Sequence, residues 1–94
     1  MQMEIIWTTS AYIDNLENIE YLLGEWYLSV ALKYEEKVIE AEELLLKGPQ
    51  LGQFDKELGL NKLLVVKQIY MMYEVRGDKI YIVRMWNNYK KPYW

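Results

Sequence analysis

The chain contains no cysteine and no histidine among its 94 residues. Without cysteine there is no disulfide, no thiolate nucleophile and no thiolate zinc ligand, and without histidine the commonest metal ligand and the usual general base are missing. The sequence also has no glycine-rich phosphate loop, dinucleotide fingerprint or serine elbow. We therefore expect no metal site and no cofactor, and chemistry based on zinc or on a histidine-dependent triad is excluded.

Long apolar runs are missing as well. No uncharged stretch approaches the roughly 18 residues needed to span a bilayer, and the start, Met1-Gln2-Met3-Glu4, lacks the basic and apolar regions of a signal peptide. We expect a cytoplasmic protein without membrane association. The length predicts one domain, residues 1–94, with a single core.

The net charge of −3 hides an uneven distribution along the chain. Residues 1–60 carry twelve acids and four lysines, a net of −8, whereas residues 61–94 carry seven bases and two acids, a net of +5. Two interpretations are open. The chain has either an acidic scaffold beside a basic binding face, or polar faces that merely differ in composition.

The first third of the chain is predicted to hold a strand and a helix. Residues Glu4–Thr9 are short, β-branched and aromatic, which is typical of a buried strand. Thr9 or Ser10 then suits a helix N-cap, because a hydroxyl accepts hydrogen bonds from the free N–H groups of the first turn. One apolar stripe follows at helical spacing, and we expect it to face the core. Its members are Tyr12, Leu16, Ile19, Leu23 and Trp26.

A second helix is predicted from near Trp26–Ser29 to Lys47, where Gly48-Pro49 ends it. Because Gly24-Glu25 weakens the pattern between the two, an antiparallel hairpin is favoured over the alternative of one long kinked helix. The inner stripe of this second helix is predicted to consist of Ala31, Tyr34, Val38, Ala41 and Leu45.

The rest of the chain is predicted to be a loop and then a sheet. Residues 48–61 hold three of the five glycines and indicate a loop with a helical turn at Phe54–Leu58. The Gly77-Asp78 pair is a two-residue hairpin signal that places Val75 opposite Ile80 and Tyr73 opposite Ile82. The predicted fold class is α+β: an N-terminal strand, a helical hairpin and a three-stranded antiparallel meander, in the order β-α-α-β-β-β. The meander strands are Leu63–Val66, Ile69–Val75 and Lys79–Met85.

Several landmarks of this order resemble the RelE/ParE superfamily of bacterial toxins. They include the strand end Trp7-Thr8, the Trp26 region before a helix, and the Gly48-Pro49 stop. Residues 67–80 resemble the family's strand pair, and residues 86–92 look like its closing motif, which commonly reads aromatic-Asp-x-Arg-x-x-Pro. The resemblance covers nearly the whole chain.

The resemblance implies a helical hairpin on one face of a twisted sheet, with the working surface on the other face and at the C-terminal edge. It also implies a toxin of a type II toxin–antitoxin system, of the plasmid-stabilisation type, that acts on a macromolecular target. Its cognate antitoxin would wrap it with an otherwise disordered segment. The RelE branch implies cleavage of messenger RNA on the ribosome, and the ParE branch implies inhibition of DNA gyrase by binding. A homodimer is a further alternative.

This sequence departs from the family pattern at three positions that commonly carry a cation. They hold Asn61, Glu74 and Tyr89 here. RNA cleavage needs a base, cationic donors for the phosphate and an acid, and losing one donor costs roughly a hundredfold in rate. Whether the chain is an enzyme therefore stays open, and binding is favoured over cleavage. A catalytically degenerate family member that serves as a protein-interaction module is the remaining alternative.

Candidate site residues follow from the resemblance and from the departures from its pattern. A non-standard ribonuclease site would use Lys62, Lys67, Tyr89 and Lys90. The aromatic C-terminus can serve core-edge packing, a protein interface or base stacking. The residues predicted to bind the target or antitoxin are Arg84, Trp86, Asn88, Lys91, Tyr93 and Trp94.

A cluster of acids on the second predicted helix is a further candidate site. Glu36, Glu40 and Glu43 lie about one turn apart, as paired carboxylates for metal or acid–base chemistry can do. They fall on the face opposite Tyr34 and Val38, and a glutamate-rich outer helix face is usually only solvated. We expect that simpler role.

Overall fold

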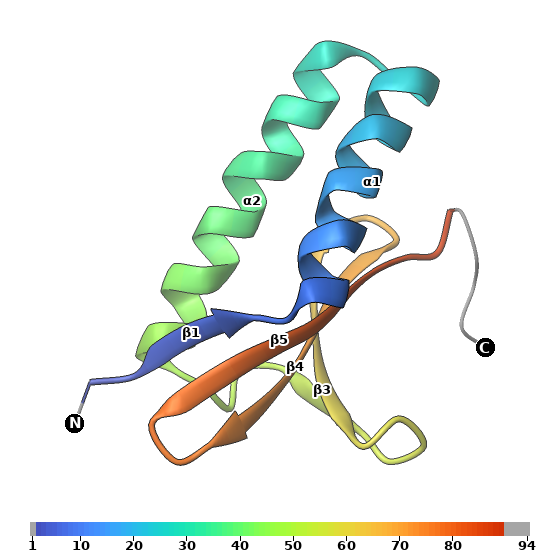
Figure 1. The fold of residues 1–94 in the computed structure, drawn as a ribbon. Coiled ribbons are helices and arrows are strands. Elements are labelled where there is room, and N and C mark those ends of the chain that lie inside the picture. The colour runs from blue at the N-terminus through green and yellow to red at the C-terminus, as the bar shows by residue number, and fades with distance from the viewer. Residues whose placement is uncertain (1, 90–94) are drawn as a thin grey trace.

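The computed structural model describes residues 2–89, in which two helices lie side by side on one face of a five-stranded sheet (Figure 1). The predicted α+β class, with an N-terminal strand, a helical hairpin and an antiparallel meander, is confirmed. Within residues 2–89, neither helix has the length and apolar character needed to cross a membrane. The elements are β1 (Glu4–Trp7), α1 (Thr9–Glu25), α2 (Leu28–Lys47), β2 (Gln53–Asp55), β3 (Leu60–Val66), β4 (Ile69–Arg76) and β5 (Lys79–Asn87).

The strand order in the sheet is β1-β5-β4-β3-β2, with β1 parallel to β5 and all other neighbours antiparallel. The predicted register around Gly77-Asp78 is confirmed: Val75 pairs with Ile80 and Tyr73 pairs with Ile82. Beyond these pairs the register shifts by one residue, because Met72 pairs with Arg84 and Val83 is left without a partner in the ladder. This bulge moves every later residue of β5 one position relative to β4.

The segment 48–61 is more ordered than predicted. Residues Gln53–Asp55 form an edge strand instead of the start of a helical turn, and only residues 56–59 make the turn. The buried Tyr73 holds this segment, because its hydroxyl accepts from the Gly52 N–H at 2.8 Å and donates to the Pro49 carbonyl at 2.8 Å. Burial raises the pKa of Tyr73, so the hydroxyl stays protonated as the donor that this contact needs.

The N-cap of the first helix lies one residue before Thr9 and two before Ser10, the two predicted caps. Thr8 is the N-cap, and its Oγ1 accepts from the Ala11 N–H at 3.1 Å. The same hydroxyl donates to the Val83 carbonyl at 3.0 Å, so the cap also fixes the helix to β5. Thr9 and Ser10 are therefore inside the helix, and their prediction as caps is wrong.

The two helices differ in how well their buried faces were predicted. The whole predicted stripe of α2 is buried, and the kinked-helix alternative is wrong, since α1 ends at Glu25 and α2 begins at Leu28. In α1 the buried residues are Ala11, Asn18 and Leu22. The predicted stripe is mostly exposed, with fractions of 58% for Tyr12, 45% for Leu16, 47% for Leu23 and 48% for Trp26, and Ile19 is half-buried.

Candidate functional site

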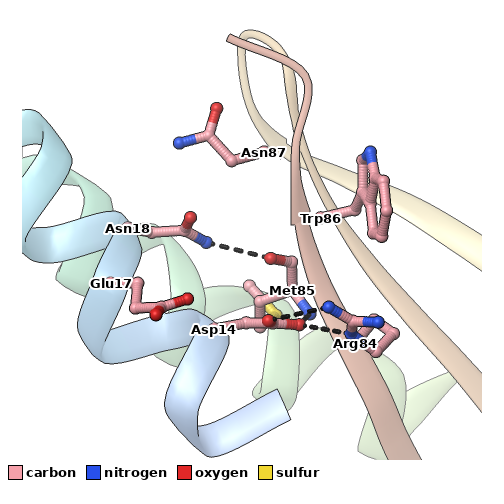
Figure 2. A pocket seen from close by; sticks show the side chains of 7 residues that line it. All are labelled: Asp14, Glu17, Asn18, Arg84, Met85, Trp86 and Asn87. Atoms are coloured by element: carbon pink, nitrogen blue, oxygen red, sulfur yellow. Dashed lines mark hydrogen bonds and ion pairs between the residues drawn. The ribbon is translucent and has the colours of Figure 1, made fainter. Parts of the chain in front are cut away.

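A pocket of about 190 Å³ lies where α1 crosses the edge of β5 beyond the end of β1 (Figure 2). We call it the α1–β5 pocket. Asp14 is its central acid: Arg84 donates to it from Nε at 2.7 Å and from Nη2 at 3.0 Å, and the Met85 N–H donates at 3.0 Å. The hydrogen bond to Asp14 raises the pKa of Arg84 although partial burial opposes it, so the guanidinium is always charged. The lining residues are Asp14, Glu17, Asn18, Arg84, Met85, Trp86 and Asn87.

Asn18 connects the same pocket to the interior. Its Nδ2 donates to the Met85 carbonyl at 3.1 Å and to the Tyr34 hydroxyl at 3.2 Å, and that hydroxyl donates to Asn15 Oδ1 at 2.6 Å. Burial raises the pKa of Tyr34, which keeps its hydroxyl neutral. These side chains satisfy buried polar groups and hold α1 against β5 and α2, so their role is structural.

The face of the sheet opposite the helices, which we call the open sheet face, carries cations beside aromatic rings. The Arg84 guanidinium lies 5.1 Å from the centre of the Trp86 ring, and Lys62 Nζ lies 5.8 Å from that of Tyr70. Between these pairs lies Met72, which is 2% exposed and is paired with Lys62 on one side and Arg84 on the other. Figure 2 shows Trp86 turned away from α1, toward this face.

Most bases in residues 61–89 take part in ion pairs. Beside the Arg84–Asp14 pair, the Asp55 carboxylate lies 3.4 Å from Lys62, Glu74 lies 2.8 Å from Arg76, and Glu4 lies 3.4 Å from Lys79. Four of the five bases in residues 61–89 therefore have an acidic partner. Lys67 differs, because it has no ion-pair partner among residues 2–89.

A larger groove, of about 650 Å³, lies between the C-terminal end of α1, the N-terminal part of α2 and the turn from β3 to β4. Its apolar walls are edged by Lys33 and Lys67, neither of which has an ion-pair partner in the described chain, and we call it the lysine-rimmed groove. The Tyr89 ring stacks on Tyr21 with centres 6.0 Å apart and lies 6.1 Å from Trp26. The lining residues are Leu22, Trp26, Ser29, Val30, Lys33, Tyr34, Val66, Lys67 and Tyr89.

The bulge in β5 explains why Lys67 and Tyr89 meet in this groove. After the shift, Ile69 pairs with Asn87 and the Asn88 N–H donates to the Gln68 carbonyl at 2.8 Å. The next residue in each direction is Lys67, in the turn between β3 and β4, and Tyr89, beyond the end of β5. Without the extra residue the ladder would bring Asn88 to this position instead.

The predicted site residues therefore lie in three places. Lys67 and Tyr89 line the lysine-rimmed groove, whereas Lys62 lies on the open sheet face with Trp86, and Arg84 joins that face to the α1–β5 pocket. Asn88 is 5% exposed, and its side-chain amide has no hydrogen-bond partner in the described chain. The remaining predicted residues, Lys90, Lys91, Tyr93 and Trp94, lie outside the described residues.

The positions that lack the family's cations have other partners here. Glu74 pairs with Arg76, Asn61 pairs with Tyr73 and Phe54 in the sheet, and Tyr89 stacks on Tyr21. Residues 2–89 contain no group of three or more acidic side chains placed to hold a metal ion. Lys33, which lines the lysine-rimmed groove, was not predicted as a site residue. The sequence signal that could have indicated it is a lysine among apolar residues near the start of α2.

The comparisons with known proteins identify a family and a solved structure of similar fold. A family model described as the ParE toxin of type II toxin–antitoxin system, parDE, matches residues 5–88. Among solved structures, a chain of the chromosomal ParDE TA system from P. aeruginosa is similar with 20% sequence identity and a TM-score of 0.77, over 92% of this chain and 96% of that chain. At that identity the likeness shows a shared fold. No curated protein matches the chain.

Proposed function

This chain belongs to the ParE toxin family of type II toxin–antitoxin systems, and on that premise we propose that it acts by binding a macromolecular target and not by cutting RNA. One observation carries the proposal. Arg84, the base best placed between the open sheet face and the C-terminal edge, is held by Asp14 through two hydrogen bonds. A guanidinium that is already neutralised by a carboxylate is a poor donor to a phosphate in a transition state.

The other groups that cleavage would need support the same proposal. Lys62 lies 3.4 Å from the Asp55 carboxylate, and it is on the other side of the sheet from Lys67 and Tyr89. Cations that neutralise a pentacoordinate phosphate must converge on one point about 3 Å away. The described residues of the predicted ribonuclease site do not converge in this way.

Expression of the chain without its antitoxin tests the proposal. We expect growth arrest, intact messenger RNA ends on ribosomes and loss of DNA gyrase supercoiling in the presence of purified protein, since gyrase is the target that the family resemblance implies. Messages cut on the ribosome would contradict the proposal. Normal growth together with tight antitoxin binding would also contradict it, and would favour a degenerate interaction module.

The antitoxin partner is proposed to cover the lysine-rimmed groove. Apolar walls from Leu22, Val30 and Val66 favour apolar side chains of a partner. Lys33 and Lys67, which have no ion-pair partner within residues 2–89, favour acidic ones. A segment that alternates apolar and acidic residues at helical spacing meets both requirements. Such a segment can be disordered when free and fold as it binds.

A ribonuclease remains a second candidate because of one contact. Lys67 and Tyr89 line the same groove, where a lysine could bind phosphate as a point charge and a phenol could act as an acid. If cut messages are found, Lys67→Ala and Tyr89→Phe should each reduce cutting about a hundredfold. Lys56→Ala, a change of an exposed lysine outside the groove, is the matched control.

A further inference from the structure

A second groove, of about 480 Å³, is lined by both helices and by the end of β1. Two exposed apolar residues face it, Tyr12 of α1 at 58% and Ile39 of α2 at 57% exposure, with Ile19 and Val38 beneath them. Within residues 2–89 it shares no residue with the lysine-rimmed groove. The lining residues are Trp7, Tyr12, Asn15, Ile19, Glu35, Val38, Ile39 and Glu42.

The charges at this groove are negative. Both ionised residues that line it, Glu35 and Glu42, are acids, and we call it the acid-rimmed groove. They are seven residues apart on α2, which corresponds to about 10 Å along the helix. Glu42 is held in place, because its Oε2 accepts from the Trp7 indole N–H at 3.0 Å.

The surrounding surface has the same sign. Residues 9–47, which make up the two helices and their turn, contain nine acids and three lysines, and α1 contains no base at all. One of the lysines, Lys37, is itself paired with Glu40 at 3.4 Å. An anionic membrane surface would therefore be repelled from this groove, and so would the acidic helical hairpin of a second copy of the chain.

We propose that the acid-rimmed groove docks a basic amphipathic helix of a partner protein. The apolar side of such a helix would cover Tyr12 and Ile39, and two lysines or arginines about 10 Å apart would meet Glu35 and Glu42. This partner segment has the opposite charge from the one that fits the lysine-rimmed groove. The inference does not rest on the proposed function, because it follows from the shape and charge of the hairpin alone.

A designed peptide tests this inference directly. The probe is a fluorescein-labelled helix of about 16 residues, or four turns, with leucines on one side and lysines flanking them at seven-residue spacing. The control peptide carries glutamates in place of the lysines. In fluorescence anisotropy we expect the lysine peptide to bind and the glutamate peptide to bind at least about tenfold more weakly. Equal binding of the two peptides would overturn the inference.

Matched protein variants locate the binding. Glu35→Lys should weaken the lysine peptide about fivefold, whereas Glu36→Lys, which makes the same change of net charge outside the groove, should change it less than about twofold. Ile39→Ser should weaken binding more than Leu32→Ser, which alters an exposed leucine of the same helix that does not line the groove. Circular dichroism confirms that each variant is folded. Equal effects within either pair would contradict the proposed location.

Discussion

The two helices differ in the chemistry of their contacts with the sheet: the buried face of α2 makes apolar contacts, whereas α1 also makes hydrogen bonds to the backbone of β5. Helix α2 buries five residues, Ala31, Tyr34, Val38, Ala41 and Leu45, in one stripe. Helix α1 instead turns Asp14, Asn15 and Asn18 inward, where they form hydrogen bonds, and it leaves Tyr12, Leu16 and Leu23 outside. An amphipathic helix can thus turn part of its polar side inward when buried backbone groups need hydrogen-bond partners, although Ala11 and Leu22 of α1 are buried as well.

The edge of β5 supplies those groups. β1 pairs with β5 only as far as Ile82, so beyond that residue the edge of β5 that faces away from β4 has no neighbouring strand. Side chains take the place of a strand. Thr8 donates to the Val83 carbonyl, Asn18 donates to the Met85 carbonyl, and Asp14 accepts from the Met85 N–H. Burying these backbone groups without partners would cost more than leaving apolar side chains of α1 in water.

The largest effect is expected on the apolar side of the comparison. Leu45 of α2 is fully buried, so Leu45→Ala should lower the free energy of unfolding by about 3 kcal/mol through lost packing and a residual cavity. Urea denaturation followed by circular dichroism measures this. The neighbouring Leu46 is 43% exposed, and Leu46→Ala should cost less than about 1 kcal/mol. Equal losses would show that α2 does not hold the core through this stripe.

A second prediction exchanges the two faces of α1. Asn18→Leu leaves the Met85 carbonyl and the Tyr34 hydroxyl without their donor, and should cost about 2 kcal/mol despite the added apolar group. Leu16→Asn adds a polar group on the exposed side and should change stability by less than about 0.5 kcal/mol. Both are read from urea midpoints. If Asn18→Leu stabilised the protein, the proposed role of Asn18 as a required hydrogen-bond donor to the Met85 carbonyl and the Tyr34 hydroxyl would be contradicted.

The ion pair of the α1–β5 pocket should contribute less. A double-mutant cycle of Asp14→Asn and Arg84→Met is expected to give a coupling of about 1 kcal/mol, reduced by solvent because the Arg84 side chain is 41% exposed. Thermal or urea unfolding of the four proteins measures the coupling. A coupling near zero would mean that the Met85 N–H, and not Arg84, is the partner of Asp14 that matters.

The smallest effect is expected where a polar contact is exposed. Asp55 accepts from the Glu57 and Leu58 N–H groups at 3.0 and 3.1 Å, and these bonds, led by that of Leu58 and helped by Lys62, lower its pKa. A lowered folded-state pKa contributes stability above the ordinary pKa of aspartate, and that stability is lost as the pH falls through the folded value. Asp55→Asn should therefore lower the melting temperature at pH 7 but not in strong acid. A difference that persists unchanged in acid would contradict the assignment.

The sequence predicted the parts of this fold that depend on local pattern. The stripe of α2, the stop at Gly48-Pro49 and the hairpin at Gly77-Asp78 follow from periodicity and turn chemistry, and the structure confirms them. The apolar period of α1 is also real. No local signal, however, indicates that one edge of β5 has no neighbouring strand beyond Ile82, or that Asn18 donates to the Met85 carbonyl there. The three-residue strand β2 is too short to leave a pattern, because its pairing with β3 supplies the order.

The candidate site was less accessible to sequence reasoning. Lys67 and Tyr89 were selected separately, and the groove that joins them depends on a one-residue bulge near Arg84 that composition does not reveal. Lys33 comes from a third element and was not predicted to take part. The ion pair between Asp14 and Arg84 could not be predicted from the sequence either, because the two residues are far apart in the chain.

The central claim is that this protein works by binding partners and that the lysine-rimmed groove is one of its binding surfaces. The affinity of the cognate antitoxin for variants of this groove tests that claim most directly. Isothermal titration should be made with wild type, Lys67→Glu and Lys56→Glu, which reverse one exposed lysine inside and one outside the lysine-rimmed groove. We predict that Lys67→Glu weakens binding about tenfold and that Lys56→Glu leaves it within about twofold of wild type. Equal affinities for the two variants would contradict the account.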